Sequence, residues 1–152
     1  MIRELPIAHA NDPFGQSAIK DTTGLGIWCA SLVMSRWMAS PDMVAQMSNT
    51  TVLELGAECG TPSLSAAIYG TPKSVTITDL NSVIINNAQY NIELNRLNNE
   101  SGGCSVTATS IDWGDETTYP TSSHGGKFDY VICSDCIYQR DIVDLLNVPG
   151  SI

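Results

Sequence analysis

Basic residues are scarce in this sequence. Seven Lys and Arg residues stand against 16 Asp and Glu residues, which gives a formal net charge of −9. A protein whose main function is to bind the phosphate backbone of a nucleic acid needs a basic surface, so this balance argues against that class. The charge permits a basic protein partner, such as a Lys-rich segment, although acidity that only provides solubility is the simpler interpretation.

Other absences exclude further classes of protein. No apolar run reaches the roughly 18 residues that a membrane-spanning helix needs, and the first ten residues lack the apolar core of a secretory signal. We therefore expect a cytoplasmic protein, or a nuclear one. The sequence also lacks the Gly-x-x-x-x-Gly-Lys-Ser/Thr pattern of P-loop proteins and the Gly-x-Ser-x-Gly pattern of serine hydrolases.

The five cysteines form no pattern of disulfides or of metal ligands. They are scattered and odd in number, whereas small disulfide-stabilised domains have an even set. Cys133 and Cys136 form a Cys-x-x-Cys pair, but zinc would need a second pair of ligands, and His9 and His124 are isolated. Cys133 also lies in an apolar run that is typical of a strand. We interpret the cysteines as reduced core thiols and expect no metal site.

Strand-like and helix-like segments alternate after an N-terminal arm over residues 1–23. The predicted strands are residues 51–55, 74–79, 105–111 and 128–134. The predicted helices are residues 24–40, 62–69, 82–98 and 141–147. Pro41 is expected to end the first helix, and Thr61 to cap the second with Pro62 at its first position. The asparagines of residues 86–99 are interpreted mostly as a solvated helix face.

This alternation predicts an α/β fold with a Rossmann-like parallel sheet, right-handed crossovers and helices on both faces. We expect one domain over residues 24–152, with the first strand inside the sheet. The run at 128–134 is nearly continuously apolar, which is typical of a strand that is covered on both faces.

The strongest local signal lies between the first predicted strand and the following helix. Residues 54–60 read Glu-Leu-Gly-Ala-Glu-Cys-Gly, and glycines in such a loop allow a tight turn and a close approach to a ligand. Asp79 ends the next strand, 23 positions (79 minus 56) after Gly56, where nucleotide-binding α/β folds place a carboxylate on ribose hydroxyls. An ordinary turn explains the glycines alone; Asp79 is what favours a ligand site.

Glu58 distinguishes between nucleotide ligands. Dinucleotide-binding loops have glycine near this position because pyrophosphate approaches there, and a carboxylate would repel it by on the order of 1 kcal/mol or more in partly desolvated surroundings. S-adenosylmethionine has no phosphate and carries an ammonium and a sulfonium, so acids at Glu54, Glu58 and Asp79 are tolerable or favourable. The loop therefore favours S-adenosylmethionine over a nicotinamide dinucleotide.

Five segments together resemble the seven-β-strand (class I) methyltransferases of the lysine methyltransferase group, methyltransferase family 16, of the methyltransferase-like 21 type. These segments are residues 24–30, 52–60, 78–80, 111–114 and 128–138. The resemblance covers roughly residues 20–146 and implies S-adenosyl-L-methionine as cofactor and an accessible lysine of a protein substrate as acceptor. Family members continue with further strands, so we expect a domain that is incomplete at its C-terminus, with a partner or the missing segment covering the fourth strand.

The resemblance also implies roles for single residues. Trp28 and the loop would line the methionine end of the cofactor, Asp79 would hold the ribose, and Trp113 would stack on adenine. The full set of implied cofactor residues is Trp28, Glu54, Gly56, Ala57, Glu58, Gly60, Asp79, Trp113 and Ser134. Asp135 and Tyr138 match the Asp-x-x-Tyr motif beside the channel for the target amine and are the implied catalytic residues. Core packing is the rival interpretation for Trp28, and capping of the next helix for Asp135.

Other functions remain open. They are methyl transfer to a small molecule or to RNA, and a truncated cofactor-binding or interaction module without turnover. The acidic balance weighs against RNA, the Asp-x-x-Tyr segment favours a protein amine, and the early end of the sequence favours the module.

Overall fold

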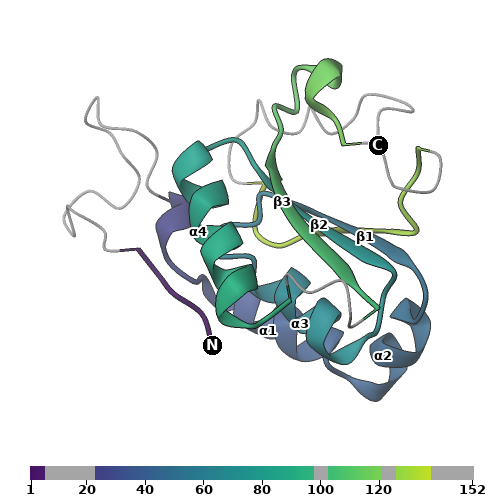
Figure 1. The fold of residues 1–152 in the computed structure, drawn as a ribbon. Coiled ribbons are helices and arrows are strands. Elements are labelled where there is room, and N and C mark those ends of the chain that lie inside the picture. Colours follow the sequence, from purple (N-terminus) through teal and green to yellow (C-terminus); the bar gives the residue numbers. More distant parts are fainter. Residues whose placement is uncertain (6–22, 98–102, 121–125, 138–152) are drawn as a thin grey trace.

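The computed structural model describes residues 1–5, 23–97, 103–120 and 126–137 (Figure 1). In these ranges it contains one sheet of parallel strands in the order β3-β2-β1-β4. The strands are β1 (Thr51–Leu55), β2 (Ser74–Asp79), β3 (Ser105–Ser110) and β4 (Tyr130–Cys133). The predicted parallel sheet, with the first strand inside it, is therefore confirmed.

The helices of the described residues are η1 (Thr23–Leu25), α1 (Cys29–Met38), α2 (Pro41–Met47), α3 (Thr61–Tyr69), α4 (Ser82–Leu94) and the short η3 (Glu116–Thr118). Helices α1 to α4 gather on one side of this sheet, whereas the short η3 lies apart from them, beyond the end of β3 (Figure 1). The crossovers through α3 and α4 both run toward the β3 edge, and right-handed crossovers in the same direction place their helices on the same face. The helix predicted at 141–147, which would follow β4, lies outside the described residues. Among those residues, no helix is long and apolar enough to cross a membrane.

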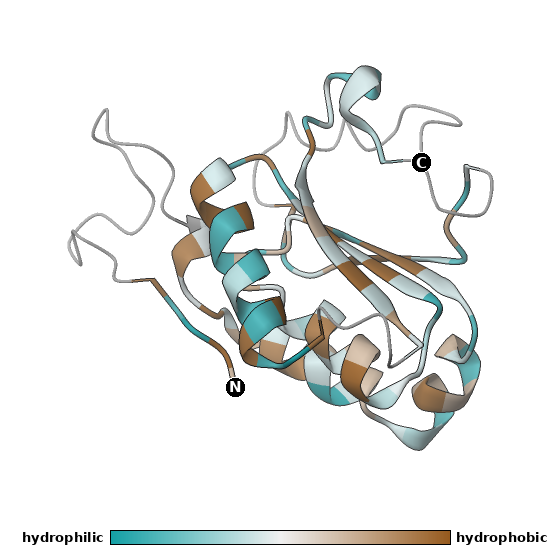
Figure 2. Cartoon of the chain, viewed as in Figure 1, coloured by the Kyte–Doolittle hydropathy of each residue, from teal (hydrophilic) through white to brown (hydrophobic). Residues whose placement is uncertain are grey.

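Alternate residues of each strand point to opposite faces of the sheet, and each face has its own apolar cluster. The larger cluster fills the space between the sheet and the helices and includes Val52, Val75, Ile77, Leu64 and Ile92. The smaller one, on the other face, consists of Leu53, Leu55 and Ile111, with Trp113 and Phe128 packed against it. Figure 2 shows hydrophobic residues along the strands and mixed hydrophilic and hydrophobic patches on α4. Because each large buried aliphatic side chain contributes about 1.5–3 kcal/mol, the larger cluster is the main source of stability.

Strand β4 differs from its prediction in one respect. Val131 pairs with Leu53 and Ile132 with Glu54 in the sheet register, so Ile132 points toward the helices and Val131 points away from them. Ile132 is buried, but Val131 is 48% exposed. In the described part of the chain β4 is thus covered on one face, and the covering of its other face by a missing segment or a partner stays a prediction.

The ends of the helices also differ from the predictions. The segment predicted as a helix over 24–40 forms η1, then an extended residue Trp28, and then α1. Pro41 begins α2 instead of only ending α1, because proline at the first turn of a helix needs no N–H partner. Helix α3 begins one residue earlier than predicted, with Gly60 as its N-cap, and α4 ends at Leu94.

The asparagines of α4 do not all face solvent. Asn86 is exposed, but Asn87 and Asn91 are 1% and 0% exposed. Both hydrogen bond to the backbone of Arg3, which lies beside the helix. The interpretation of a solvated face is therefore wrong for these two residues, because their partner lies more than 80 residues away in the sequence.

Candidate functional site

The loop that follows β1 has an unusual backbone. Gly56 and Gly60 have φ angles of 59° and 73°, and Glu58, which has a side chain, has a φ of 52°. Such left-handed conformations suit glycine and are unfavourable for other residues. A Cβ atom on Gly56 would lie 3.1 Å from Cys136 Cβ and 3.7 Å from Trp113 Cζ2. Gly56 is therefore required for this packing, and Glu58 occupies a backbone conformation that is typical of glycine.

Asp79, at the end of β2, contacts this loop directly. The Glu58 N–H donates to Asp79 Oδ2 at 3.3 Å, and the Ala57 N–H donates to the carbonyl of Thr78 at 2.9 Å. The Asn81 N–H donates to the other carboxylate oxygen of Asp79 at 3.1 Å. The predicted meeting of Asp79 and the glycine loop at one edge of the sheet is thus observed, while its contact with a ribose stays a prediction.

Glu58 makes this edge of the sheet electrostatically distinctive. Its carboxylate accepts hydrogen bonds from Ser31 Oγ at 3.0 Å and from the backbone N–H of Trp28. Burial raises the pKa of Glu58 to about 7, and the nearby carboxylates of Asp79 and Asp135 add to this rise, although the two hydrogen bonds lower the pKa. Three carboxylates are therefore close enough to influence one another, and a cation beside them would stabilise the ionised form of Glu58.

Glu54, in β1 just before the loop, lies in the interior. It is 1% exposed, and its Oε2 accepts a hydrogen bond from the Ser63 N–H at 3.1 Å. Burial raises the pKa of Glu54 to about 8. The carboxylate binds one of the free N–H groups at the start of α3, a position that favours an acceptor. Almost none of its surface is open to a ligand, so direct contact between Glu54 and a cofactor stays a prediction.

Trp113 lies against the loop from the other face of the sheet. Its ring atom Cζ2 would lie 3.7 Å from a Cβ atom on Gly56. The carbonyl of Trp113 accepts a hydrogen bond from the Tyr119 hydroxyl at 2.6 Å. The side chain is only partly buried, so it packs on the core and also leaves surface beside the loop. Stacking on adenine stays a prediction that this placement allows.

Ser134 follows β4 and has an unsatisfied hydroxyl. The residue is 6% exposed, and its Oγ has no hydrogen-bond partner within the described ranges. Buried hydroxyls are normally satisfied, so such an atom at the carboxyl end of a strand is typical of a group whose partner is a ligand or water.

Two residues predicted to act at this site, Trp28 and Asp135, flank Glu58. Trp28 is the N-cap of α1 and donates its N–H to Glu58. Asp135 is exposed and has a φ of 58°, which is not the extended backbone of an N-cap. Cys136 and Ile137 are not helical, so capping of a helix that begins at Cys136 is not supported. Tyr138, the other predicted catalytic residue, lies outside the described residues.

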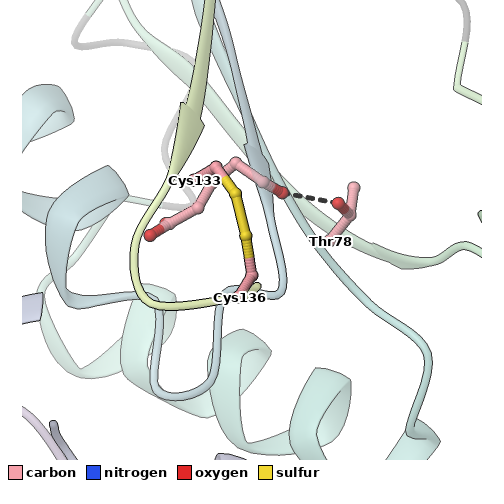
Figure 3. The surroundings of a disulfide bond; sticks show 4 residues. Thr78, Cys133 and Cys136 are labelled. Atoms are coloured by element: carbon pink, nitrogen blue, oxygen red, sulfur yellow. Dashed lines mark hydrogen bonds between the residues drawn. A yellow bond between two sulfur atoms is a disulfide. The ribbon is translucent and has the colours of Figure 1, made fainter. Parts of the chain in front are cut away.

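The cysteines next to Asp135 correct another prediction. Cys133 and Cys136 form a disulfide (Figure 3), so the interpretation of reduced thiols is wrong for this pair. The tight turn between them, with Asp135 in the left-handed conformation, brings the two side chains together. Figure 3 also shows, near this disulfide, the hydrogen bond that the Thr78 hydroxyl donates to the carbonyl of Glu54. Cys29, Cys59 and Cys104 are free, and the described residues contain no cluster of His, Cys, Asp and Glu that could hold a metal ion.

Comparison with known proteins identifies the family. The model of a family described as lysine methyltransferase matches residues 15–148. The chain belongs to this family.

Several curated relatives support this assignment. The chain is 30% identical over 134 residues to the human protein-lysine N-methyltransferase EEF2KMT, covering 84% of this chain and 39% of that protein. It is 28% identical over 131 residues to the mouse protein-lysine methyltransferase METTL21E, covering 84% and 50%. It is 31% identical over 123 residues to the protein N-terminal and lysine N-methyltransferase EFM7 of Candida glabrata, covering 79% and 46%. The chain therefore spans half or less of the length of these relatives.

A solved structure supports the fold. A Methanococcus maripaludis protein described as an S-adenosyl-L-methionine-dependent methyltransferase superposes with a TM-score of 0.51 and 14% identity. The match covers 77% of this chain and 47% of that one. At this identity, the likeness concerns the α/β fold alone.

Two residues of the site in this member of the lysine methyltransferase family were not predicted from the sequence. Ser31 donates to Glu58, and its signal was a small polar residue in the otherwise apolar first turn of α1. Cys136 lies against Gly56, and no local pattern indicated that contact.

Proposed function

We propose that this chain is the cofactor-binding part of a protein-lysine methyltransferase that uses S-adenosyl-L-methionine. The observation that carries the proposal is the direct contact of the Gly56–Glu58 loop with Asp79 at one edge of the sheet. Membership of the lysine methyltransferase family supports the same conclusion. When bound, the cofactor supplies an activated methyl group on a sulfonium, and the acceptor is the neutral amine of a lysine side chain.

The residues present fit such a cofactor. The hydroxyl of Ser134 lacks a partner among the described residues, and the nearby acids suit a cationic group. In this proposal Asp79 holds the ribose hydroxyls, Trp113 covers the adenine, and Glu58 with Trp28 holds the methionine end. A carboxylate at Glu58 would repel pyrophosphate, which disfavours a dinucleotide at this position.

Asp135 is proposed to orient the incoming amine. It lies at the carboxyl end of β4, is exposed, and is near enough to Glu58 to influence its pKa. Methyl transfer needs mainly the alignment of nucleophile and methyl group, and such alignment is worth several kcal/mol. The lysine must arrive without its proton, which water can accept before the amine binds.

Two further points belong to the same proposal. Val131 and Ile137 are 48% and 58% exposed, so a further segment or a partner chain is proposed to cover this side of β4. A cytoplasmic or nuclear location is also proposed, and imaging of a tagged chain would test it.

Calorimetry tests the cofactor class before any substrate is known. S-adenosylmethionine and S-adenosylhomocysteine are expected to bind, each at least about tenfold more tightly than NAD, because the repulsion at Glu58 acts on NAD alone. Tighter binding of NAD, or no binding of either sulfur compound, would contradict the proposal. A Glu58→Gln variant serves as the matched control, since it removes the charge and is expected to narrow the difference.

Asp135→Asn tests the role in methyl transfer. Asparagine adopts the left-handed backbone readily, so the variant is expected to keep its fold and its affinity for S-adenosylmethionine. In a longer chain that includes the further C-terminal strands, we expect the rate of methyl transfer to a Lys-containing acceptor protein to fall by about tenfold or more, since a neutral amide holds an amine less strongly than a carboxylate. Full activity of the asparagine variant, with loss only in an unfolded Asp135→Ala, would show that the carboxylate has no part in the reaction.

A further inference from the structure

Residues 1–5, here called the N-terminal strap, lie along helix α4 (Figure 1). Asn87, Asn91 and Asn95 are spaced four residues apart and so lie on one face of that helix. The Arg3 N–H donates to Asn91 Oδ1 at 2.7 Å, and Asn91 Nδ2 donates back to the carbonyl of Arg3 at 3.1 Å. Asn95 Nδ2 donates to the carbonyl of Met1 at 2.7 Å. Side chains of the helix therefore bind the backbone of the strap.

The side chain of Arg3 adds to this attachment. Its Nε donates to Asn87 Oδ1 at 2.8 Å, and its guanidinium lies 3.6 Å from the centre of the Tyr90 ring. Asn87 Nδ2 donates to the carbonyl of Arg3 at 3.0 Å. Arg3 is thus fixed at its amide, its carbonyl and its side chain, which makes it the centre of the strap.

The same contacts extend to the glycine loop. Asn91 Nδ2, besides binding Arg3, donates to the carbonyl of Cys59 at 3.1 Å. Glu4 Oε1 accepts a hydrogen bond from the Ile27 N–H at 2.9 Å, and the Leu5 N–H donates to the carbonyl of Leu25 at 2.9 Å. The strap, the segment before α1 and the loop after β1 are therefore joined in one network.

This network reaches the neighbours of two residues, Glu58 and Trp28, that contact each other within the proposed cofactor site. Glu58 accepts the N–H of Trp28. Cys59, the neighbour of Glu58, is held by Asn91, and Ile27, the neighbour of Trp28, is held by Glu4. The strap and Asn91 of α4, which binds it, therefore hold the neighbours of the two residues proposed to hold the methionine end of the cofactor.

We infer that Asn91 and Glu4 are positioning residues for S-adenosylmethionine, and that the N-terminal strap sets the affinity of the site without touching the ligand. The inference rests on the proposed function. A loop that is already held in its binding conformation loses less conformational entropy when the ligand binds. Release of the strap therefore weakens binding by increasing the number of conformations that the loop and the Trp28 segment adopt in the free protein.

Two pairs of variants test this inference by calorimetry with S-adenosylmethionine. Asn91→Asp replaces the amide that donates to Arg3 and Cys59 by a carboxylate without donors, and the dissociation constant is expected to rise about tenfold or more. Asn86→Asp makes the same change of charge at an exposed position of the same helix and is expected to bind as the wild type does. Glu4→Ala removes an exposed acceptor and is expected to weaken the binding of S-adenosylmethionine about three- to tenfold. Glu4→Gln keeps an acceptor and is expected to bind S-adenosylmethionine as the wild type does.

Amide hydrogen exchange without cofactor supplies a second readout. In Glu4→Ala we expect faster exchange at residues 57–60 and 27–28, with core strand amides unchanged. If Asn91→Asp does not fold, the Glu4 pair decides. Unchanged affinity and exchange in a folded Glu4→Ala, or equal weakening in Glu4→Gln, overturns the inference. Failure of the wild-type protein to bind S-adenosylmethionine overturns the proposed function itself, and the inference with it.

Discussion

Asp79→Ala is expected to weaken the binding of S-adenosylmethionine by about 1–3 kcal/mol, which corresponds to roughly five- to 150-fold in the dissociation constant. The carboxylate lies beside the glycine loop, where it is proposed to accept hydrogen bonds from the ribose hydroxyls. It also accepts the N–H groups of Glu58 and Asn81, so its loss affects the loop as well as the ligand. Calorimetry on the folded variant measures the change.

Control variants separate these two contributions of Asp79. Asp79→Asn keeps one carbonyl oxygen as an acceptor and removes the charge, so we expect an intermediate affinity. Asp42→Ala removes an exposed carboxylate in the first turn of α2 and is expected to leave the affinity unchanged. If Asp79→Ala, shown to be folded by circular dichroism, binds the cofactor as tightly as the wild type, the ribose role is wrong.

Stability is expected to fall as pH rises, because of Glu54. Its ordinary pKa of 4.5 is raised to about 8 in the folded protein by burial, so the folded state binds this proton more tightly than the unfolded state does. The corresponding stabilisation is fully present below about pH 4.5 and is lost as pH rises through about 8. A shift of this size corresponds to on the order of 3–5 kcal/mol between pH 4.5 and pH 9.

Glu54→Gln isolates this effect, since glutamine keeps an acceptor for the Ser63 N–H and does not titrate. Urea unfolding is expected to show similar stability for the two proteins near pH 5 and a more stable variant near pH 9. Glu93→Gln, at an exposed position of α4, should follow the wild-type curve at every pH. A constant difference between wild type and Glu54→Gln across this range would mean that Glu54 is not protonated in the folded protein.

The strands could be predicted because their signals are local. Short β-branched and apolar runs such as residues 51–55 and 74–79 end at a glycine or an acid, and their alternation with helices requires a parallel sheet. The end of a helix is harder to predict, since Pro41 has the same local sequence signature whether it ends one helix or begins another. Whether a face of β4 is exposed depends on which other residues pack against it, and the sequence of the strand alone does not specify those residues.

The site could be predicted in outline for a related reason. Strand ends of a parallel sheet meet at one edge, so the loop at Gly56 and the carboxylate of Asp79 could be brought together from their positions alone. The burial of Glu54 and the donation from Ser31 to Glu58 depend on how α1 and α3 pack. The buried Asn87 and Asn91 both depend on Arg3, which lies 84 and 88 positions before them, and no local pattern encodes such a partner.

The attachment of the N-terminal strap to α4 has a consequence for biosynthesis. Arg3 leaves the ribosome 88 residues before Asn91, which at about 5–20 residues per second is a delay of roughly 4–18 seconds. During this interval the strap has no helix to bind, so residues 1–5 reach their final place only after a much later segment of the chain has been made. The ligand site therefore matures only after α4 has emerged, and a nascent chain that stalls earlier carries its glycine loop without the anchor from Asn91.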